Sequence, residues 1–80
     1  MKVRVLVSFK DSVLDPQGQT VKNALHTLGY DFVKEVRQGK VFELEIADMP
    51  AEAAEKHILE IAHKVLANPI IEKFTYQIVD

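Results

Sequence analysis

The sequence predicts an α+β domain of the ferredoxin-like kind, with the order βαββαβ, a four-stranded antiparallel sheet and two helices on one face. Three observations predict it. Apolar residues alternate with polar ones near both ends of the chain, as in β-strands. Two inner stretches carry apolar residues at helical spacing. Between those stretches, Gln38-Gly39 divides the run from Val33 to Ala47 and is suited to a tight hairpin turn.

The first half of the chain predicts one strand and one helix. Lys2 to Lys10 alternates and forms the strand. Asp15 followed by Pro16 fits a helix N-cap with proline at the first helical position. This helix runs to about Leu28, and Gly29 fits the left-handed position after its end. Apolar residues predicted to face the core are Val3, Val5, Val7 and Phe9 on the strand, and Val21, Ala24, Leu25 and Leu28 on the helix.

The second half repeats the pattern after the predicted hairpin. Asp48-Met49-Pro50 opens the second helix and Ala67-Asn68-Pro69 ends it. Ile70 to Val79 supplies the last strand. Residues predicted to be buried are Ala54, Ile58, Ile61, Ala62, Val65 and Leu66 on the helix, and Phe74, Tyr76 and Ile78 on the strand.

This order leaves one face of the sheet bare. Right-handed crossovers place both helices on the same face, and the strand order becomes 4-1-3-2. On the bare face, Arg4 can neutralise Glu43 or Glu45 across the sheet. The apolar residues there favour self-association through the sheet face or its edges, as a homodimer or a tetramer. Candidate residues for this contact are Arg4, Leu6, Val41, Glu43, Glu45 and Val79.

Length and composition narrow the classes of function. Residues 1–80 make a single domain with a small core. The chain has no cysteine, which excludes thiol catalysis and disulfides. The formal net charge is −2 and basic residues are scattered, so no nucleic-acid partner is expected. Apolar runs are too short to cross a membrane, and we expect a cytoplasmic protein.

Metal-binding, catalytic and cofactor-binding residues are not predicted. His57 and His63 lie about 240° apart around a helix and cannot share a metal ligand set. Glu43 and Glu45 stand about 7 Å apart on one strand face, a spacing that permits acid–base chemistry. A charged strip paired with Arg4 is the preferred interpretation. Gly39-Lys40 lacks the glycine-rich run of a phosphate loop.

Two other modules share the βαββαβ order. An RNA-recognition module stacks bases on aromatic residues of its open face, where this chain has Val41, Glu43 and Glu45, and the negative charge opposes phosphate. A small-molecule regulatory domain of the ACT type remains the alternative, because it has this topology, associates side by side and binds amino acids at the interface.

Five segments closely resemble the PurS family, the small subunits of phosphoribosylformylglycinamidine (FGAM) synthase. The resemblance covers nearly the full length, with the segments in order. They are V-x-V-x-V-x-x-K-x-S-V-L-D-P-Q-G (Val3 to Gly18), V-K-x-A-L-H-x-L-G-Y (Val21 to Tyr30), V-R-x-G-K (Val36 to Lys40), E-L-E-I (Glu43 to Ile46) and L-A-N-P-I-I-E (Leu66 to Glu72).

This resemblance implies a non-catalytic subunit of an ATP-dependent, glutamine-using ligase in purine biosynthesis. The assembled enzyme uses ATP, Mg and glutamine, and this chain is expected to bind no cofactor. A PurL-type synthetase carries the amidination and a PurQ-type glutaminase releases the ammonia. The PurS-like subunit is implied to dimerise, to bridge these two partners and to assist ammonia transfer.

Three exposed turns are the candidate contacts with the larger partners. Arg37 and Lys40 are predicted to project as a basic knob, and the corner after Asp15 is rigid enough for docking. Structural roles in turns and caps explain the same residues almost as well. The candidate contact residues are Asp15, Pro16, Gln17, Gly18, Arg37, Gly39, Lys40, Asn68 and Pro69.

Overall fold

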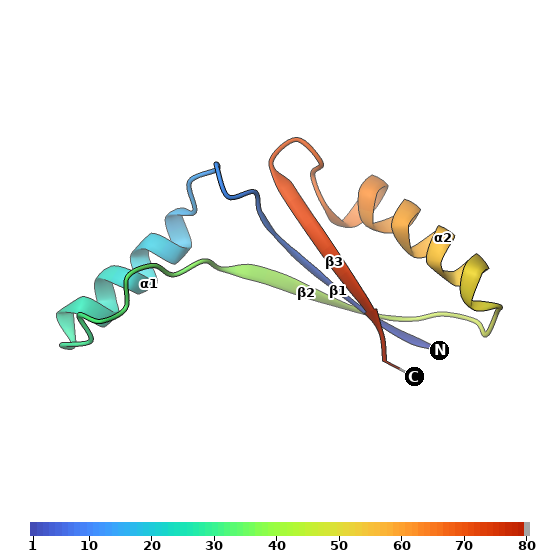
Figure 1. Cartoon of the computed structure of the whole chain (residues 1–80), viewed down its shortest axis with the longest axis horizontal. Coiled ribbons are helices and arrows are strands. Elements are labelled where there is room, and N and C mark those ends of the chain that lie inside the picture. The colour runs from blue at the N-terminus through green and yellow to red at the C-terminus, as the bar shows by residue number, and fades with distance from the viewer. Residues whose placement is uncertain (80) are drawn as a thin grey trace.

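The chain forms three strands and two helices in a computed structural model that describes residues 1–79 (Figure 1). The α+β class agrees with the prediction. In chain order the elements are β1 (Lys2–Phe9), α1 (Pro16–Thr27), β2 (Gly39–Glu45), α2 (Ala51–Ile61), a π-helical turn (Ala62–Leu66) and β3 (Glu72–Ile78).

The sheet has β1 at its centre, and β1 pairs antiparallel with both neighbours in the order β2-β1-β3. Val5 stands opposite Phe42 on β2 and opposite Tyr76 on β3, so the apolar residues of all three strands share one face. The side of α2 that carries Ile58 covers this face. The buried core consists of Val3, Val5, Val7, Ala54, Ile58, Ala62 and Ala67.

The predicted four-stranded sheet and its central hairpin are wrong. Within residues 1–79 the sheet has three strands, and the chain runs through Gln38-Gly39 into β2 without reversing (Figure 1). The reason lies in hydrogen bonds that tie residues 30–38 to α1 and to its N-cap. The backbone N–H of Gln38 donates to the Asp15 carboxylate, and His26 Nε2 donates to the Val33 carbonyl at 2.7 Å. Residues 30–38 therefore return alongside α1 instead of pairing with β2.

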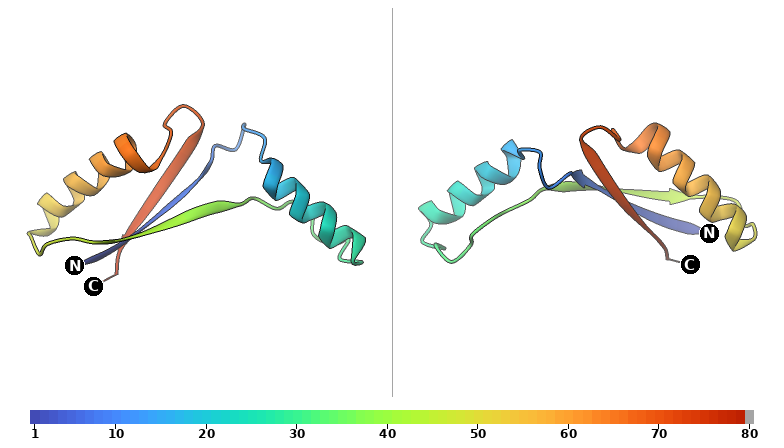
Figure 2. Two further views of the ribbon diagram at one scale, coloured as in Figure 1. Left: turned by 180° about the vertical axis from the view of Figure 1, so that it is seen from behind. Right: turned by 45° about the horizontal axis from the view of Figure 1, so that its top comes forward.

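The prediction that both helices cover one face of the sheet is also wrong. α1 projects beyond the sheet, at the opposite end of the molecule from α2 (Figures 1 and 2). The molecule extends over 49 × 27 × 14 Å, and its radius of gyration is 16.0 Å. A compact domain of this length has a radius of gyration of about 12 Å. The chain thus has a projecting arm, residues 16–38, which comprises α1 and the segment that returns to β2.

Both ends of α1 follow the local sequence signals. Asp15 is the N-cap and Pro16 is the first helical residue. Gly29 has φ 95°, in the left-handed region. Its N–H donates to the carbonyl of His26, and the Tyr30 N–H donates to that of Leu25, which together form a Schellman ending. The predicted cap at Asp15-Pro16 and the predicted left-handed position of Gly29 are confirmed.

A π-helical turn at the end of α2 changes which residues are buried. The Ala67 N–H donates to the Ala62 carbonyl, five residues earlier, at 2.9 Å. This wider turn rotates the following residues relative to an α-helix. Val65, predicted to be buried, is therefore 76% exposed, while Ala67 is buried. The predicted burial of Ala54, Ile58 and Ala62 is confirmed.

Candidate protein-interaction surfaces

Asp15 joins the arm to the sheet from a buried position. The residue is only 4% exposed. One carboxylate oxygen accepts from the Gly18 N–H at 2.9 Å and caps α1. The other accepts from the Gln38 N–H at 2.6 Å, where the arm returns to β2. These two hydrogen bonds, from Gln38 first and Gly18 second, hold the pKa of Asp15 below its usual value, and the nearby charge of Arg37 acts in the same direction.

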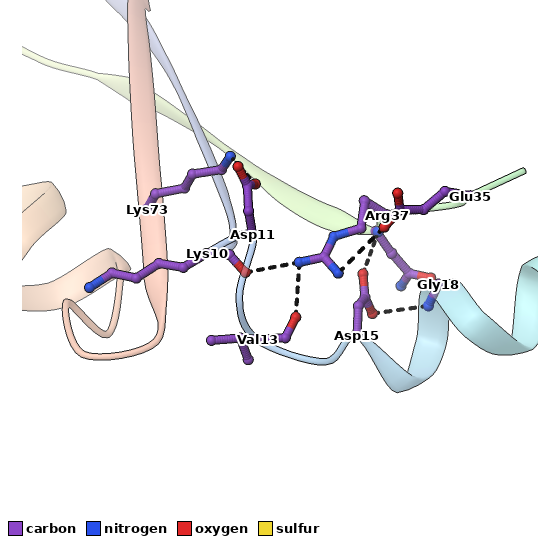
Figure 3. Close-up of polar contacts among 9 residues, drawn as sticks. Lys10, Asp11, Val13, Asp15, Gly18, Glu35, Arg37 and Lys73 are labelled. Carbon is purple, nitrogen blue, oxygen red and sulfur yellow. Dashed lines mark hydrogen bonds and ion pairs between the residues drawn. The ribbon is translucent and has the colours of Figure 1, made fainter.

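Arg37 closes the same junction from the returning segment (Figure 3). Its Nη2 donates to the carbonyl of Lys10 at 2.9 Å and to that of Val13 at 3.0 Å. Both carbonyls lie in the loop between β1 and α1. The guanidinium is therefore turned toward this loop and does not project as predicted. Of the predicted basic knob only Lys40 remains, and its ammonium lies 3.8 Å from Glu72.

We call this set of contacts the clasp: the hydrogen bonds of Asp15 and Arg37 with Gly18, Gln38, Lys10 and Val13. A hydrogen bond of 2.7 Å from the side-chain nitrogen of Gln38 to the side-chain oxygen of Gln17 extends the clasp. Gly18 is packed tightly within it, because a Cβ there would meet the Val36 carbonyl and would lie 2.9 Å from Asp15 Oδ2. Four predicted partner contacts, Asp15, Gln17, Gly18 and Arg37, are thus brought together.

Asn68 organises the turn between the π-helical turn and β3. Its side-chain oxygen accepts from the Ile70 N–H at 3.1 Å, and its own N–H donates to Glu72 Oε1 at 2.7 Å. Pro69 follows and is exposed. This turn lies beside the loop that carries the clasp, because the Lys10 N–H donates to the Ile71 carbonyl. The predicted contacts at Asn68-Pro69 therefore neighbour those at the clasp.

The six residues predicted for self-association lie together on the open face of the sheet. Arg4 stands opposite Glu43, and Leu6 stands opposite Val41. Glu45 pairs with Lys2, and the Val79 N–H donates to the Lys2 carbonyl. The face combines exposed apolar side chains with charges of both signs. Its role as a contact stays a prediction, as do the partner contacts at the turns.

The arm exposes an apolar surface that the sequence analysis did not predict. Val21 and Leu28, predicted to face the core, are exposed on α1, and Leu28 is 72% exposed. Beside the helix end, Tyr30 and Phe32 pack edge to face with ring centroids 6.1 Å apart. Phe32 is 79% exposed. Two aromatic residues within three positions of a helix-ending glycine were the signal that could have indicated this surface.

Two kinds of feature are missing from the described residues. Among residues 1–79, no group of three His, Asp or Glu side chains is placed to hold a metal ion. Over the same residues, no helix is both long and apolar enough to cross a bilayer. What the structure offers instead is a small sheet with an open face, a projecting apolar arm and a buried polar junction between them.

Exposed apolar surfaces of this kind are typical of the class of proteins that act through contacts with other proteins. The family model of PurS, described as phosphoribosylformylglycinamidine (FGAM) synthase, matches residues 2–80. The chain therefore belongs to the PurS family of FGAM synthase subunits.

Individual relatives agree with this family. The PurS subunit of Bacillus subtilis is 44% identical over 77 residues, which cover 96% of this chain and 90% of that protein. The C2 crystal form of B. subtilis PurS has a TM-score of 0.78 at 46% identity and covers 95% of this chain and 94% of that one. A chain in the PurLQS structure from Thermotoga maritima has a TM-score of 0.85 at 28% identity, with 95% and 93% covered. The ACT-type alternative receives no support from these relatives.

Proposed function

We propose that this chain is the dimeric adaptor of FGAM synthase in purine biosynthesis, which joins the synthetase and glutaminase subunits and assists ammonia transfer between them. The observation that carries this proposal is the family match over residues 2–80. A T. maritima chain of the same fold occurs in a PurLQS structure, which supports a place in a complex of this kind. By itself the chain is not an enzyme.

The division of labour follows from the chemistry that each subunit brings. The PurQ-type glutaminase would supply the cysteine nucleophile that this chain lacks. The PurL-type synthetase would use ATP and Mg, and this chain would bind neither. Its contribution is to hold the two partners so that ammonia passes between them without loss to water. The complex would act in the cytoplasm.

Self-association is supported by the exposed surface of the arm. Val21, Leu28, Tyr30 and Phe32 are exposed within one short stretch of chain. Monomeric soluble proteins rarely expose large contiguous apolar patches, and such patches mark interaction sites. A second copy of this chain is the occupant that we propose, because each copy also offers a surface that such an arm could cover.

That second surface is the helix-facing side of the sheet beyond α2. Phe42 and Leu44 on β2, with Phe74 and Tyr76 on β3, are only partly buried. The outer edge of β2 has no strand beside it among the described residues. An arm from the partner copy could cover these side chains and pair with this edge, and the reverse contact would follow from twofold symmetry. A further contact between open sheet faces would join dimers into a tetramer.

Assembly of the complex tests the adaptor function. The purified chain is mixed with a PurL-type synthetase and a PurQ-type glutaminase, with ATP, Mg and glutamine present, and the masses are measured by sedimentation velocity. We expect a species containing all three subunits only when this chain is added. A synthetase–glutaminase complex that forms equally well without this chain would contradict the proposal.

A further inference from the structure

We propose that the clasp holds the arm in its projecting position and thereby selects exchange of arms between two copies over a closed monomer. This role of the clasp rests on the proposed dimer and concerns contacts within each copy. In a closed monomer, α1 would fold back onto its own sheet beside α2. That arrangement is the four-stranded fold that the sequence pattern favours.

The arm leaves and rejoins the sheet at one junction, and the clasp ties both chain segments there. The outgoing segment, residues 10–15, provides the carbonyls of Lys10 and Val13 and the carboxylate of Asp15. The returning segment provides the guanidinium of Arg37 and the N–H of Gln38. These bonds link residues 23 to 27 positions apart. The direction of α1 therefore depends on this junction.

Closure of the arm would break the clasp. To bring the apolar side of α1 onto its own sheet, the arm must rotate about residues 10–15 and 37–39. To pair with β2, the returning segment must reverse at Gln38-Gly39, and that reversal removes the Gln38 N–H from Asp15. Asp15 is a buried residue, so its carboxylate would lose a partner in a poorly hydrated place. A buried acceptor without its donor is costly, and the projecting position is favoured.

Tight packing makes the junction stiff as well as bonded. Gly18 lies so close to the returning segment that a Cβ would meet the Val36 carbonyl. The first turn of α1 therefore contacts the backbone of the return directly. A loose linker would let the arm sample both positions, whereas this junction fixes its direction and keeps the apolar surface of α1 off its own sheet, where a second copy can cover it.

The distance between the two helices measures the position of the arm. The chain has no cysteine, so Asn23→Cys on α1 and Lys56→Cys on α2 provide two clean sites for spin labels. Both residues are exposed. Labelled chain is diluted in excess unlabelled chain so that only distances within one copy are recorded. The projecting arm gives one long distance, and a closed monomer brings packed helices to about 10 Å between axes.

We expect the otherwise wild-type chain to give the long distance alone. Arg37→Ala should add a short-distance population and should weaken self-association about tenfold or more, because two charged hydrogen bonds are lost. Arg37→Lys keeps the charge, but its ammonium lies one bond closer to the backbone than Nη2 and should not reach both carbonyls. This variant serves if the alanine variant does not fold, and it should also add a short-distance population and weaken self-association. Lys34→Ala removes a positive charge from the same segment without touching the clasp and should match the wild type.

Two results would overturn different claims. A dimeric wild type whose Arg37→Ala and Arg37→Lys variants keep the long distance and the same dimer Kd would overturn the role of the clasp. A wild-type chain that light scattering finds monomeric over the micromolar range would refute the proposed dimer, and with it the selection that this inference describes.

Discussion

The carboxylate of Asp15 accepts a 2.6 Å hydrogen bond from the backbone N–H of Gln38, which lies 23 residues further along the chain. The same carboxylate caps α1 through Gly18. One buried side chain therefore fixes both where the helix begins and where the arm returns to the sheet. A residue that sequence analysis identifies as a local helix cap is also a long-range structural tie.

The charge of Asp15 should make part of the stability depend on pH. Hydrogen bonds from Gln38 and Gly18 lower its pKa in the folded chain from the ordinary value of 3.8. The stabilisation is thus fully present above about pH 5, and it is lost as the pH falls through the lower folded pKa. Asp15→Asn should reduce stability at neutral pH and should flatten the loss of stability on acidification. Urea unfolding followed by circular dichroism, at neutral pH and at about pH 3, measures both effects.

The matched control for this experiment is Asp31→Asn, which removes a carboxylate from an exposed turn. It should keep most of the acid dependence of the wild type. If Asp15→Asn lost as much stability on acidification as the wild type, the carboxylate of Asp15 would not stabilise the folded chain as described.

Two glycines of the arm should differ in their tolerance of alanine. Gly29→Ala costs about 1–2 kcal/mol, because only its positive φ is strained and nothing lies within 4 Å of the added Cβ. Gly18→Ala should cost more, since the new Cβ meets backbone that cannot move without opening the clasp. Chemical unfolding of both variants at one protein concentration compares them. A smaller loss in Gly18→Ala would contradict the close packing of the junction.

The small core should depend strongly on Ile58. This side chain is 0% exposed against the β1 valines, and Ile58→Ala should reduce the free energy of unfolding by about 2–5 kcal/mol. Leu59 is the neighbouring control, at 41% exposed, and Leu59→Ala should cost clearly less. Thermal and urea unfolding at equal concentrations measure the difference. Similar losses for both variants would mean that α2 does not present this face to the sheet.

Self-association should depend on the apolar side of the arm. Leu28→Lys places a charge on a surface that the dimer would bury, while a cation at a helix C-terminus suits the helix itself. We expect this variant to be monomeric at concentrations where the wild type is dimeric, as measured by light scattering. Thr27→Lys introduces the same charge one residue earlier and should leave the dimer intact. Equal dissociation of both variants would point to a general charge effect.

Short-range signals were sufficient to predict much of the fold. The cap at Asp15 and the Schellman ending at Gly29 involve residues within a few positions of each other, and the alternation of β1 places Val3, Val5 and Val7 on one face. Each of these features depends on neighbouring residues alone. The same holds for β2 and β3, whose alternation places Phe42 and Leu44, and Phe74 and Tyr76, on the predicted side of the sheet.

The central hairpin could not be judged from local sequence. Gln38-Gly39 is compatible with a turn, but the partner of Gln38 is a side chain 23 residues earlier. The partners of Arg37 are backbone carbonyls, which leave no signature in the sequence. Arg37 was therefore predicted to project. Similarly, one π-helical bond at Ala62 moves Val65 out of the predicted buried stripe.

The comparison of glutamine-supported with ammonia-supported synthesis of FGAM tests the adaptor function most directly. PurL-type and PurQ-type subunits are assayed with ATP and Mg, with and without this chain. We predict that omission of the chain abolishes most of the glutamine-supported rate, while the rate with added ammonia changes little. An unchanged glutamine-supported rate without the chain would contradict the account.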